Sequence, residues 1–156
     1  MKVIVVGASG AVGKCAVDAL SARHEVISVN RSSGDIQADL EDIESIRAMY
    51  RETGKVDAVV SAVGHGHFGA VHEMTTEQFM KGINHKLLPQ VNLVLEGFDY
   101  LNDGGSFTLT SGVLNRDPIP GGSCGRRQWR AGWFCARCSG GHAARYPYQC
   151  GEPGST

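Results

Sequence analysis

The chain has 156 residues, of which 42% are hydrophobic and 20% are charged, a composition typical of one globular domain. Fifteen basic and sixteen acidic side chains give a formal net charge of -1, so no overall attraction to nucleic acid or to an anionic membrane is expected. No window approaches the roughly 18 apolar residues of a membrane span, and the opening apolar run is too short for a signal peptide. We therefore expect a cytoplasmic protein that acts on a small molecule, with no nucleic-acid or membrane partner.

The composition divides the chain into two segments. Residues 1–120 carry a net charge of -5, whereas residues 121–156 carry +4, from five arginines and the single acid Glu152. The second segment holds eight glycines and four of the five cysteines but no Val, Ile, Leu or Met. Because such a segment supplies no ordinary core layer, we predict one folded domain over residues 1–120 and an irregular tail over residues 121–156.

The first elements in the chain predict a strand–helix–strand unit. Val3-Ile4-Val5-Val6 is a continuous β-branched run, typical of a parallel strand that is covered on both faces. After a glycine turn, apolar residues recur at helical spacing from Ala11 to Leu20, and Cys15 is expected to be buried among them. A second apolar stretch over residues 26–29 follows as the next strand.

The alternation of strands and helices continues to residue 110. A short strand is expected at residues 36–38, and an amphipathic helix that begins near Ile43 ends at Gly54, before a strand at residues 56–60. Because parallel neighbours need crossover helices, the pattern predicts a doubly wound, Rossmann-like parallel α/β sheet with about five strands, incomplete at its C-terminal side.

A long helix precedes the last predicted strand, at residues 106–110. Thr75 and Gln78 form a capping box at its start, and Pro89 is expected to bend it. Its apolar stripe is predicted to contain Phe79, Ile83, Leu87, Val91, Val94 and Phe98.

A glycine motif lies between the first strand and the first helix. Gly7 to Gly13 reads G-x-x-G-x-x-G, in which Gly7 permits a tight turn and Gly13 a close helix contact. Gly10 lets the backbone approach a pyrophosphate at the helix N-terminus. The alternative is a glycine turn that holds no ligand. The predicted cofactor-binding loop consists of Gly7, Ser9, Gly10, Ala11, Val12 and Gly13.

The end of the second predicted strand bears on the choice between NAD and NADP. An acid there would bind the ribose 2′-hydroxyl and repel a 2′-phosphate, but this chain has Asn30-Arg31-Ser32-Ser33. A guanidinium with neighbouring hydroxyls suits a 2′-phosphate. We therefore predict NADP, with NAD less favoured, and Asn30, Arg31 and Ser32 as contacts. The alternative is that Arg31 is a solvated surface side chain.

These residues resemble the short-chain dehydrogenase/reductase family over essentially all of residues 1–120. Asp39-Leu40 resembles the family's acid-plus-aliphatic pair near the adenine, and Ser61-Ala62-Val63-Gly64 resembles its N-N-A-G stretch. Thr110-Ser111-Gly112 resembles the strand end that carries its serine. The resemblance implies that Asp39, Leu40, Ala62, Val63 and Gly64 belong to the cofactor surface.

The resemblance also implies hydride transfer at a small carbonyl or alcohol. The family uses a tyrosine as general acid/base, a lysine four residues later, a serine that holds the substrate oxygen, and an asparagine on the long helix. Ser111 matches the serine, but Cys124, Gln128 and Lys86 stand at the other three positions.

Two interpretations stay open: an atypical NADP-dependent oxidoreductase that is impaired in this chain, or a non-catalytic NADP-binding regulator or partner protein. The resemblance further implies that an intact relative forms a homo-oligomer.

The tail suggests a change of reading frame near residues 122–124, and hence a truncated chain. If each tail codon is read from its second base, Trp129 and Trp133 must become glycine. With permitted codon choices, the segment from His142 can read M-P-R-G-I-R-I-N-V-V-S-P, which resembles the family's P-x-G-I-R-V-N-x-V-x-P and restores the missing aliphatic residues. The shifted frame does not restore the tyrosine and lysine.

No metal site is predicted. His65, His67 and His72 lie in the loop after the fourth strand, where substrate contact is the favoured interpretation, and no clear carboxylate geometry accompanies them. The lone C-x-x-C of Cys135 and Cys138 fits no zinc motif. Lys86 is expected on the polar face of the long helix, from which it could reach the ligand crevice.

Overall fold

The strands form one parallel sheet. The computed structural model describes residues 1–67 and 73–111, and the strand order within them is β3-β2-β1-β4-β5. This order matches the first five strands of the doubly wound dinucleotide-binding order 3-2-1-4-5-6, so the predicted Rossmann-like fold class is confirmed. The predicted tail, residues 121–156, lies outside the described residues. The strands are β1 (Lys2–Val6), β2 (Glu25–Asn30), β3 (Ile36–Gln37), β4 (Val56–Ser61) and β5 (Leu101–Leu109).

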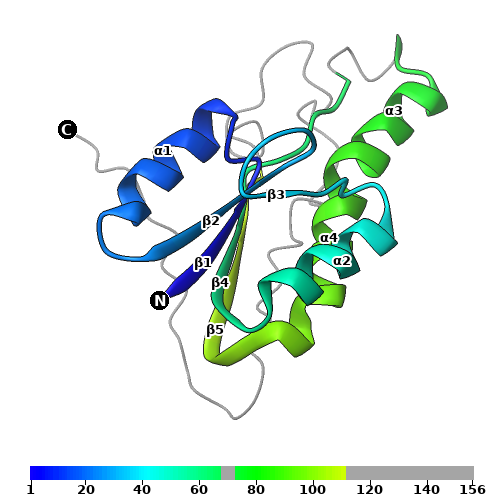
Figure 1. The fold of residues 1–156 in the computed structure, drawn as a ribbon. Coiled ribbons are helices and arrows are strands. Elements are labelled where there is room, and N and C mark those ends of the chain that lie inside the picture. Colours follow the sequence, from blue (N-terminus) through cyan, green and yellow to red (C-terminus); the bar gives the residue numbers. More distant parts are fainter. Residues whose placement is uncertain (68–72, 112–156) are drawn as a thin grey trace.

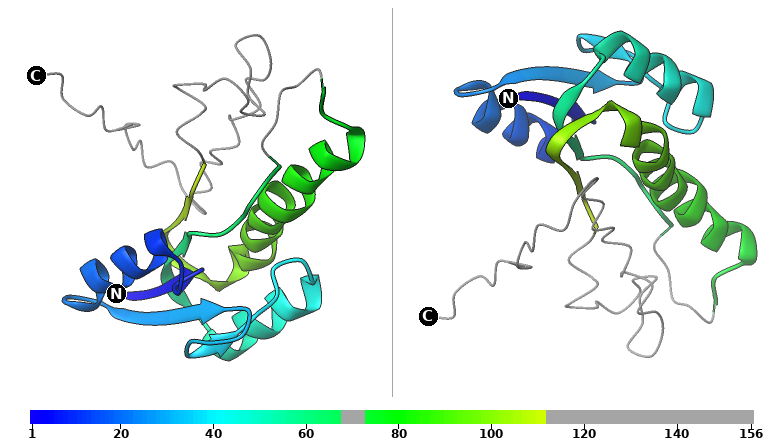
Figure 2. Two further views of the ribbon diagram at one scale, coloured as in Figure 1. Left: turned by 90° about the horizontal axis from the view of Figure 1, so that it is seen from above. Right: turned by 90° about the horizontal axis from the view of Figure 1, so that it is seen from below.

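Helices cover both faces of the sheet (Figures 1 and 2). Helix α1 (Ala11–Ser21) lies on one face, whereas α2 (Ile43–Thr53) and α4 (Leu88–Gly97) lie on the other. Side chains alternate between the two faces of a strand, so Val3 and Val5 join the cluster under α1, and Ile4 and Val6 join the larger cluster under α2 and α4. The unbroken β-branched run of β1 is therefore explained by burial on both sides.

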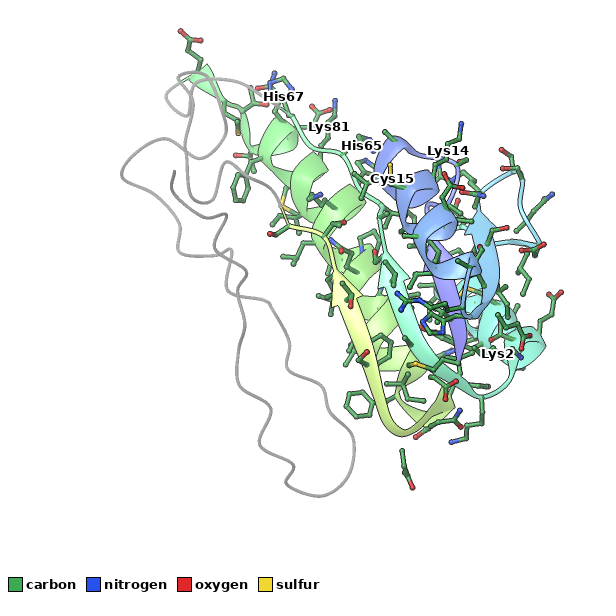
Figure 3. All side chains as sticks on the ribbon, turned by 90° about the vertical axis from the view of Figure 1, so that its left-hand side faces the viewer. Lys2, Lys14, Cys15, His65, His67 and Lys81 are labelled. Carbon is green, nitrogen blue, oxygen red and sulfur yellow. The ribbon has the colours of Figure 1, made fainter. Side chains whose placement is uncertain are left out.

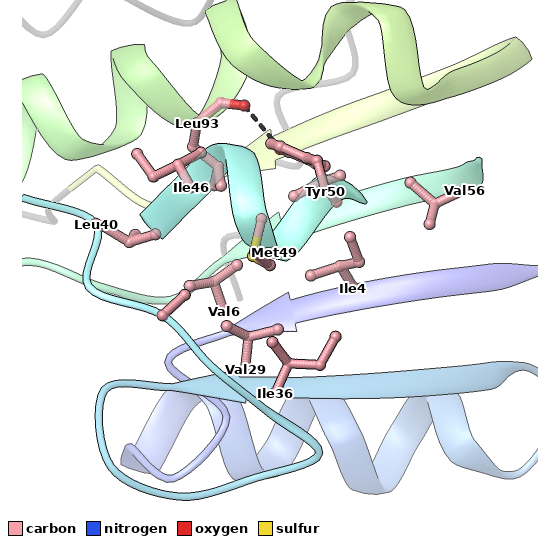
Figure 4. Packing of buried hydrophobic residues seen from close by; sticks show 12 residues of the cluster. Ile4, Val6, Val29, Ile36, Leu40, Ile46, Met49, Tyr50, Val56 and Leu93 are labelled. Carbon is pink, nitrogen blue, oxygen red and sulfur yellow. Dashed lines mark hydrogen bonds between the residues drawn. The ribbon is translucent and has the colours of Figure 1, made fainter. Parts of the chain in front are cut away.

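Tyr50 of α2 is the largest fully buried side chain in the main core (Figure 4). Its hydroxyl donates a hydrogen bond to the carbonyl oxygen of Leu93 at 2.7 Å, and its ring stacks on Tyr100 with 5.3 Å between ring centroids. Burial raises the pKa of Tyr50 above its ordinary value, so the hydroxyl stays protonated as a donor. Gly97 of α4 lies directly against the Tyr50 hydroxyl: a Cβ at Gly97 would stand 2.3 Å from the tyrosine oxygen, so the position has no room for a side chain.

Replacing Tyr50 with phenylalanine removes this donor and leaves the ring in place. We expect Tyr50→Phe to lower the free energy of unfolding by about 1 kcal/mol, as for the loss of one buried hydrogen bond. Urea denaturation followed by circular dichroism measures the change. Tyr100→Phe is the matched control, because that change removes a hydroxyl from a half-buried ring of the same stack and should leave the midpoint unchanged. Equal stability of Tyr50→Phe and the unsubstituted chain would contradict the prediction.

The long helical segment is not uniform. It begins with α3 (Thr76–Gly82), whose predicted Thr75–Gln78 capping box is present, passes through a π-helical turn at Ile83–Leu87, and continues as α4. Pro89, where a bend was predicted, lies in the first turn of α4, two residues after the π-turn ends. Proline removes an N–H and crowds the carbonyl four residues before it, which favours an irregular turn there. A short 3₁₀ turn, Phe98–Tyr100, ends the segment.

The predicted apolar stripe of this segment was partly wrong. Phe79, Leu87 and Phe98 are exposed, and of the predicted stripe only Val94 is fully buried. The π-turn adds a residue to the helical repeat, so a stripe drawn at constant spacing leaves the core beyond the turn. Before the turn, α3 carries Phe79 and has no buried residue. The buried face of α4 consists of Pro89, Gln90, Leu93, Val94 and Gly97.

Strand β5 begins five residues earlier than predicted. Val56 pairs with Leu101 and Ala58 pairs with Ser106, so three extra residues stand in β5 between these two pairs. Gly104, within this irregularity, has φ +79°. Glycine is the residue that adopts such a backbone most readily. The pattern Asn-Asp-Gly-Gly indicates a loop from sequence, whereas it forms an irregular strand start beside β4.

Candidate functional site

The glycine loop after β1 is bonded to the end of β2. Gly7 has φ +81° and donates its N–H to the carbonyl oxygen of Val29 at 2.8 Å. The N–H of Ser9 donates to the side-chain oxygen of Asn30 at 2.8 Å. The predicted loop and the predicted strand-end residues are therefore one structural unit, and Asn30 positions the loop.

The glycines at positions 10 and 13 have different surroundings. A Cβ on Gly13 would stand 2.0 Å from the carbonyl oxygen of Gly7, so Gly13 permits α1 to pack on the loop. A Cβ on Gly10 would meet only the same oxygen, at 3.3 Å, and Gly10 is exposed. No side chain caps the N-terminus of α1. The amides of its first turn are therefore available to an anion, as in a pyrophosphate site.

Arg31 is neither free nor simply solvated. Its Nη2 atom lies 2.8 Å from Asp39 and 3.1 Å from Glu41, and these bonds to Asp39 and Glu41 raise the pKa of Arg31 above its ordinary value. The N–H of Glu41 and the Arg31 guanidinium lower the pKa of Asp39. Both carboxylates bond to the same guanidinium nitrogen. They therefore hold the guanidinium of Arg31 at the end of β2.

The other predicted residues near β2 differ in exposure. Leu40 is 8% exposed and belongs to the main core, so a ligand can reach its backbone rather than its side chain. Ser32 is exposed beside Arg31. His85, from the π-turn, contacts Glu41 at 2.8 Å through Nδ1 and stacks on His65 with 5.1 Å between ring centroids. His85 and Arg31 together lower the pKa of Glu41, with His85 the larger cause.

A cleft of about 390 Å³ lies where β1, β4 and β5 end. In a doubly wound sheet this edge is where ligands bind. Five of the seven lining residues were predicted as site residues. Of the other two, Lys86 was expected to be able to reach the crevice, whereas Thr110 was not assigned a role. Its lining consists of Val12, Ala62, Val63, Gly64, Lys86, Thr110 and Ser111.

The strand ends that carry these residues are fixed by hydrogen bonds. Thr110 donates to the carbonyl oxygen of Ser61 through both its N–H (3.1 Å) and its hydroxyl (2.8 Å). Gln90 donates to the carbonyl oxygens of Lys86 (3.0 Å) and Thr110 (3.3 Å). The end of β4, the end of β5 and the π-turn are therefore joined, and Ser111 follows directly at the mouth of the cleft.

The predicted burial of Cys15 was wrong. Cys15 is exposed (Figure 3), contrary to expectation, because α1 packs on the sheet through Gly13, Ala16, Val17 and Leu20, and Cys15 lies off that face.

Metal-ligand clusters and membrane-spanning helices are absent from residues 1–67 and 73–111. No group of three metal-ligating side chains occurs among them, and His72, Cys124, Gln128, Cys135 and Cys138 lie outside them. No helix in that part of the chain is long and apolar enough to cross a membrane.

The fold and the glycine loop together define a Rossmann-like nucleotide-binding domain. The model of the NAD dependent epimerase/dehydratase family matches residues 3–88, more than half of the chain, and the chain belongs to this family. Its relatives are short-chain dehydrogenases/reductases, which confirms the resemblance noted from sequence.

Two curated reductases show the relationship at the level of sequence. Hydroxynaphthalene reductase arp2 of Aspergillus fumigatus is 29% identical over 121 residues, which cover 74% of this chain and 44% of that protein. Short chain dehydrogenase claC of Passalora fulva is 26% identical over 106 residues, which cover 65% of this chain and 40% of that protein. The match therefore spans less than half the length of these relatives.

Solved structures show the same relationship. The protein lin1944 from Listeria innocua is 47% identical, with a TM-score of 0.76 and coverage of 80% of this chain and 62% of that one. A small-chain dehydrogenase in complex with NADPH is 26% identical, with a TM-score of 0.68 and coverage of 78% of this chain and 55% of that one. The chain therefore spans less than two thirds of the length of each of these two solved structures.

Proposed function

We propose that residues 1–120 form the dinucleotide-binding domain of an NADP-dependent short-chain dehydrogenase/reductase, which transfers a hydride between the nicotinamide and a small carbonyl or alcohol. The observation that carries the proposal is the cleft at the strand ends. It joins the start of α1, the segment after β4 and Ser111 after β5. Its volume of about 390 Å³ lies in the range of small-molecule sites.

Each part of the site has a role in this proposal. A bound NADPH supplies the hydride, and with it the two electrons of the reduction. The open amides between Gly10 and Gly13 hold the pyrophosphate at the positive end of the α1 dipole. Arg31, with Ser32 beside it, holds the 2′-phosphate, and Ser111 donates a hydrogen bond to the substrate oxygen. The remaining proposed surface consists of Asp39, the Leu40 backbone, Ala62, Val63 and Gly64.

The preference for NADP depends on Arg31. Arg31→Met removes a charge-assisted contact to the 2′-phosphate, so we expect NADPH to bind about tenfold more weakly while NADH binding is unchanged. Fluorescence titration with both dinucleotides measures the two dissociation constants. Arg51→Met is the matched control, because it removes the same charge from an exposed position on α2 and should change neither constant. An equal loss for both dinucleotides would contradict a role in recognising the 2′-phosphate.

A non-catalytic NADP-binding regulator or partner protein is the second candidate. Cys124 and Gln128 favour it, because neither can act as the family's tyrosine or lysine. NADPH titration followed by assays with a panel of aldehydes and ketones separates the two. Steady loss of NADPH absorbance with any carbonyl excludes the regulator, whereas saturable binding without turnover supports it. Absence of binding overturns both candidates.

The reading-frame hypothesis stays a prediction with its own test. The tail's lack of aliphatic residues supports it. Sequencing the encoding DNA from the codon of Pro118 past the stop codon, and translating the shifted frame, gives the answer. An open shifted frame with strand and helix patterns supports a longer native protein, which we propose to be a homo-oligomer. A frame that closes quickly would show that the cysteine-rich tail is native.

A further inference from the structure

Lys86 stands at an unusual place in the helix. It belongs to the π-helical turn at Ile83–Leu87 and lines the cleft together with Thr110 and Ser111. A π-turn adds one residue to the helical repeat, redirects the side chains that it carries, and is frequently found at functional sites. Here the turn brings a half-buried lysine to the ends of β4 and β5.

The position of Lys86 is fixed from two sides. Its stem lies directly against Gly64, where a Cβ would stand 2.7 Å from the lysine Cγ, and Gly64 has φ +106°. Its carbonyl oxygen accepts a hydrogen bond from Gln90 at 3.0 Å, and Gln90 also bonds the end of β5 through Thr110. The backbone segments that carry Lys86 and Ser111 are therefore held at a fixed separation.

Among the described residues, no acidic side chain pairs with Lys86, whereas two arginines are paired. Arg31 pairs with Asp39 and Glu41, and Arg47 of α2 pairs with Glu44 and Glu96. Burial lowers the pKa of Lys86 from its ordinary value. A surface lysine is normally solvated or paired, so an unpaired, half-buried ammonium in a ligand cleft indicates an action on the ligand.

We propose that Lys86 donates the proton to the substrate's carbonyl oxygen, while Ser111 holds the same oxygen. This inference rests on the proposed function and gives it the acid that Cys124 and Gln128 cannot supply. Lys86 and Ser111 line the same cleft from different elements, the π-turn and the segment after β5, so the proposal places the substrate oxygen between their side chains.

The reduction balances with the groups named. The carbonyl carbon receives a hydride from the reduced nicotinamide, a C–H bond forms, and the π electrons of the C=O bond move to oxygen. That oxygen takes a proton from Lys86 Nζ, which gives the alcohol, the oxidised nicotinamide and a neutral amine. Water then returns a proton to the amine. Because burial lowers the pKa of Lys86, its ammonium is a stronger acid than that of an ordinary lysine.

Substitutions of Lys86 test the assignment. Lys86→Met removes the ammonium at similar length, so kcat for carbonyl reduction should fall about 100-fold or more, with the NADPH dissociation constant unchanged. In the unsubstituted chain, kcat should fall as rising pH removes the proton from Lys86. Lys86→Arg keeps the charge but holds its proton, so it should lower kcat and abolish this alkaline fall. Lys81→Met, on the exposed side of α3 (Figure 3), is the control and should leave kcat and the pH profile unchanged.

A second measurement does not depend on turnover. Acylation with acetic anhydride, followed by peptide mass spectrometry, reports the accessibility and reactivity of each lysine. NADPH together with an unreactive carbonyl analogue should slow the acylation of Lys86 and leave that of Lys81 unchanged. Acylation of Lys86 at an unchanged rate would place its ammonium away from the reacting atoms and overturn the proposal.

The outcomes separate this inference from the proposed function. If Lys86→Met weakens NADPH binding and leaves kcat intact, Lys86 binds the cofactor and the proton-donor assignment fails. If the unsubstituted chain binds NADPH but reduces no carbonyl, that assignment also fails for this chain, while dinucleotide binding stands. If NADPH does not bind, the proposed function itself is overturned.

Discussion

Gly13→Ala is expected to lower the free energy of unfolding by about 2–3 kcal/mol or more, as for overpacking at a buried position. The added Cβ would stand 2.0 Å from the carbonyl oxygen of Gly7, 2.7 Å from its carbonyl carbon and 2.8 Å from the Cα of Ala8. All three are backbone atoms, so no side chain can rotate away. The loop cannot retreat either, because Gly7 is bonded to Val29 and lies close to the backbone of Ala62 on its other side.

Urea denaturation followed by circular dichroism measures this loss. Gly82→Ala is the matched control, since it makes the same change at the last residue of α3, where a Cβ meets nothing within 4 Å. Alanine favours a helix over glycine by about 1 kcal/mol, so the control should keep or raise stability. Unfolding of Gly13→Ala at the midpoint of the unsubstituted chain would mean that α1 packs less closely on the loop than described.

The fold was predictable from sequence where local and tertiary requirements agree. The run Val3 to Val6 has no polar residue, so only a strand covered on both faces fits it. The glycine spacing after it fits only a turn that opens a helix, and Thr75 with Gln78 fixes a helix start. Each of these signals is contained within a few neighbouring residues, and each predicted element is present in the structure.

The errors arose where tertiary contacts decide the conformation. The π-turn at Ile83–Leu87 changes the helical repeat, and no periodicity analysis at constant spacing can detect it. The same turn carries Lys86, which lines the cleft, so the place of this lysine and the shifted apolar stripe of α4 have one cause. Pro89, three residues after Lys86, was the available signal for an irregular turn. The pairing of Arg31 with Glu41 depends on how the loop after β3 folds back, which local sequence does not determine.

The site was predictable to the extent that it is built from strand ends. Val12, Ala62, Val63, Gly64 and Ser111 follow strands whose carboxyl ends meet at one edge of a parallel sheet, and all five line one cleft. What the structure adds is the joining of these segments through Gln90 and Thr110. Side-chain bonds between residues far apart in the sequence leave no periodic trace in it.

Gly10→Val is expected to abolish dinucleotide binding while the fold persists. The first turn of α1 offers backbone amides to the pyrophosphate, and a branched side chain at Gly10 would hold the anion away from them. Loss of two charge-assisted hydrogen bonds corresponds to at least about a 100-fold rise in the NADPH dissociation constant. Stability should fall by only about 1 kcal/mol, because Gly10 is exposed, has an extended backbone (φ -73°) that any residue adopts, and caps the helix better than valine does.

Fluorescence titration with NADPH and a urea midpoint for the same sample measure both quantities. Ala22→Val, at the exposed opposite end of α1, is the control and should leave binding unchanged. Binding by Gly10→Val at the original affinity would mean that the loop holds no pyrophosphate. The comparison with Gly13→Ala is informative because the two glycines lie three residues apart in one motif. Gly13 faces the loop backbone and Gly10 faces solvent, so a loop that merely turns the chain requires Gly13 alone, whereas a loop that binds a dinucleotide requires both.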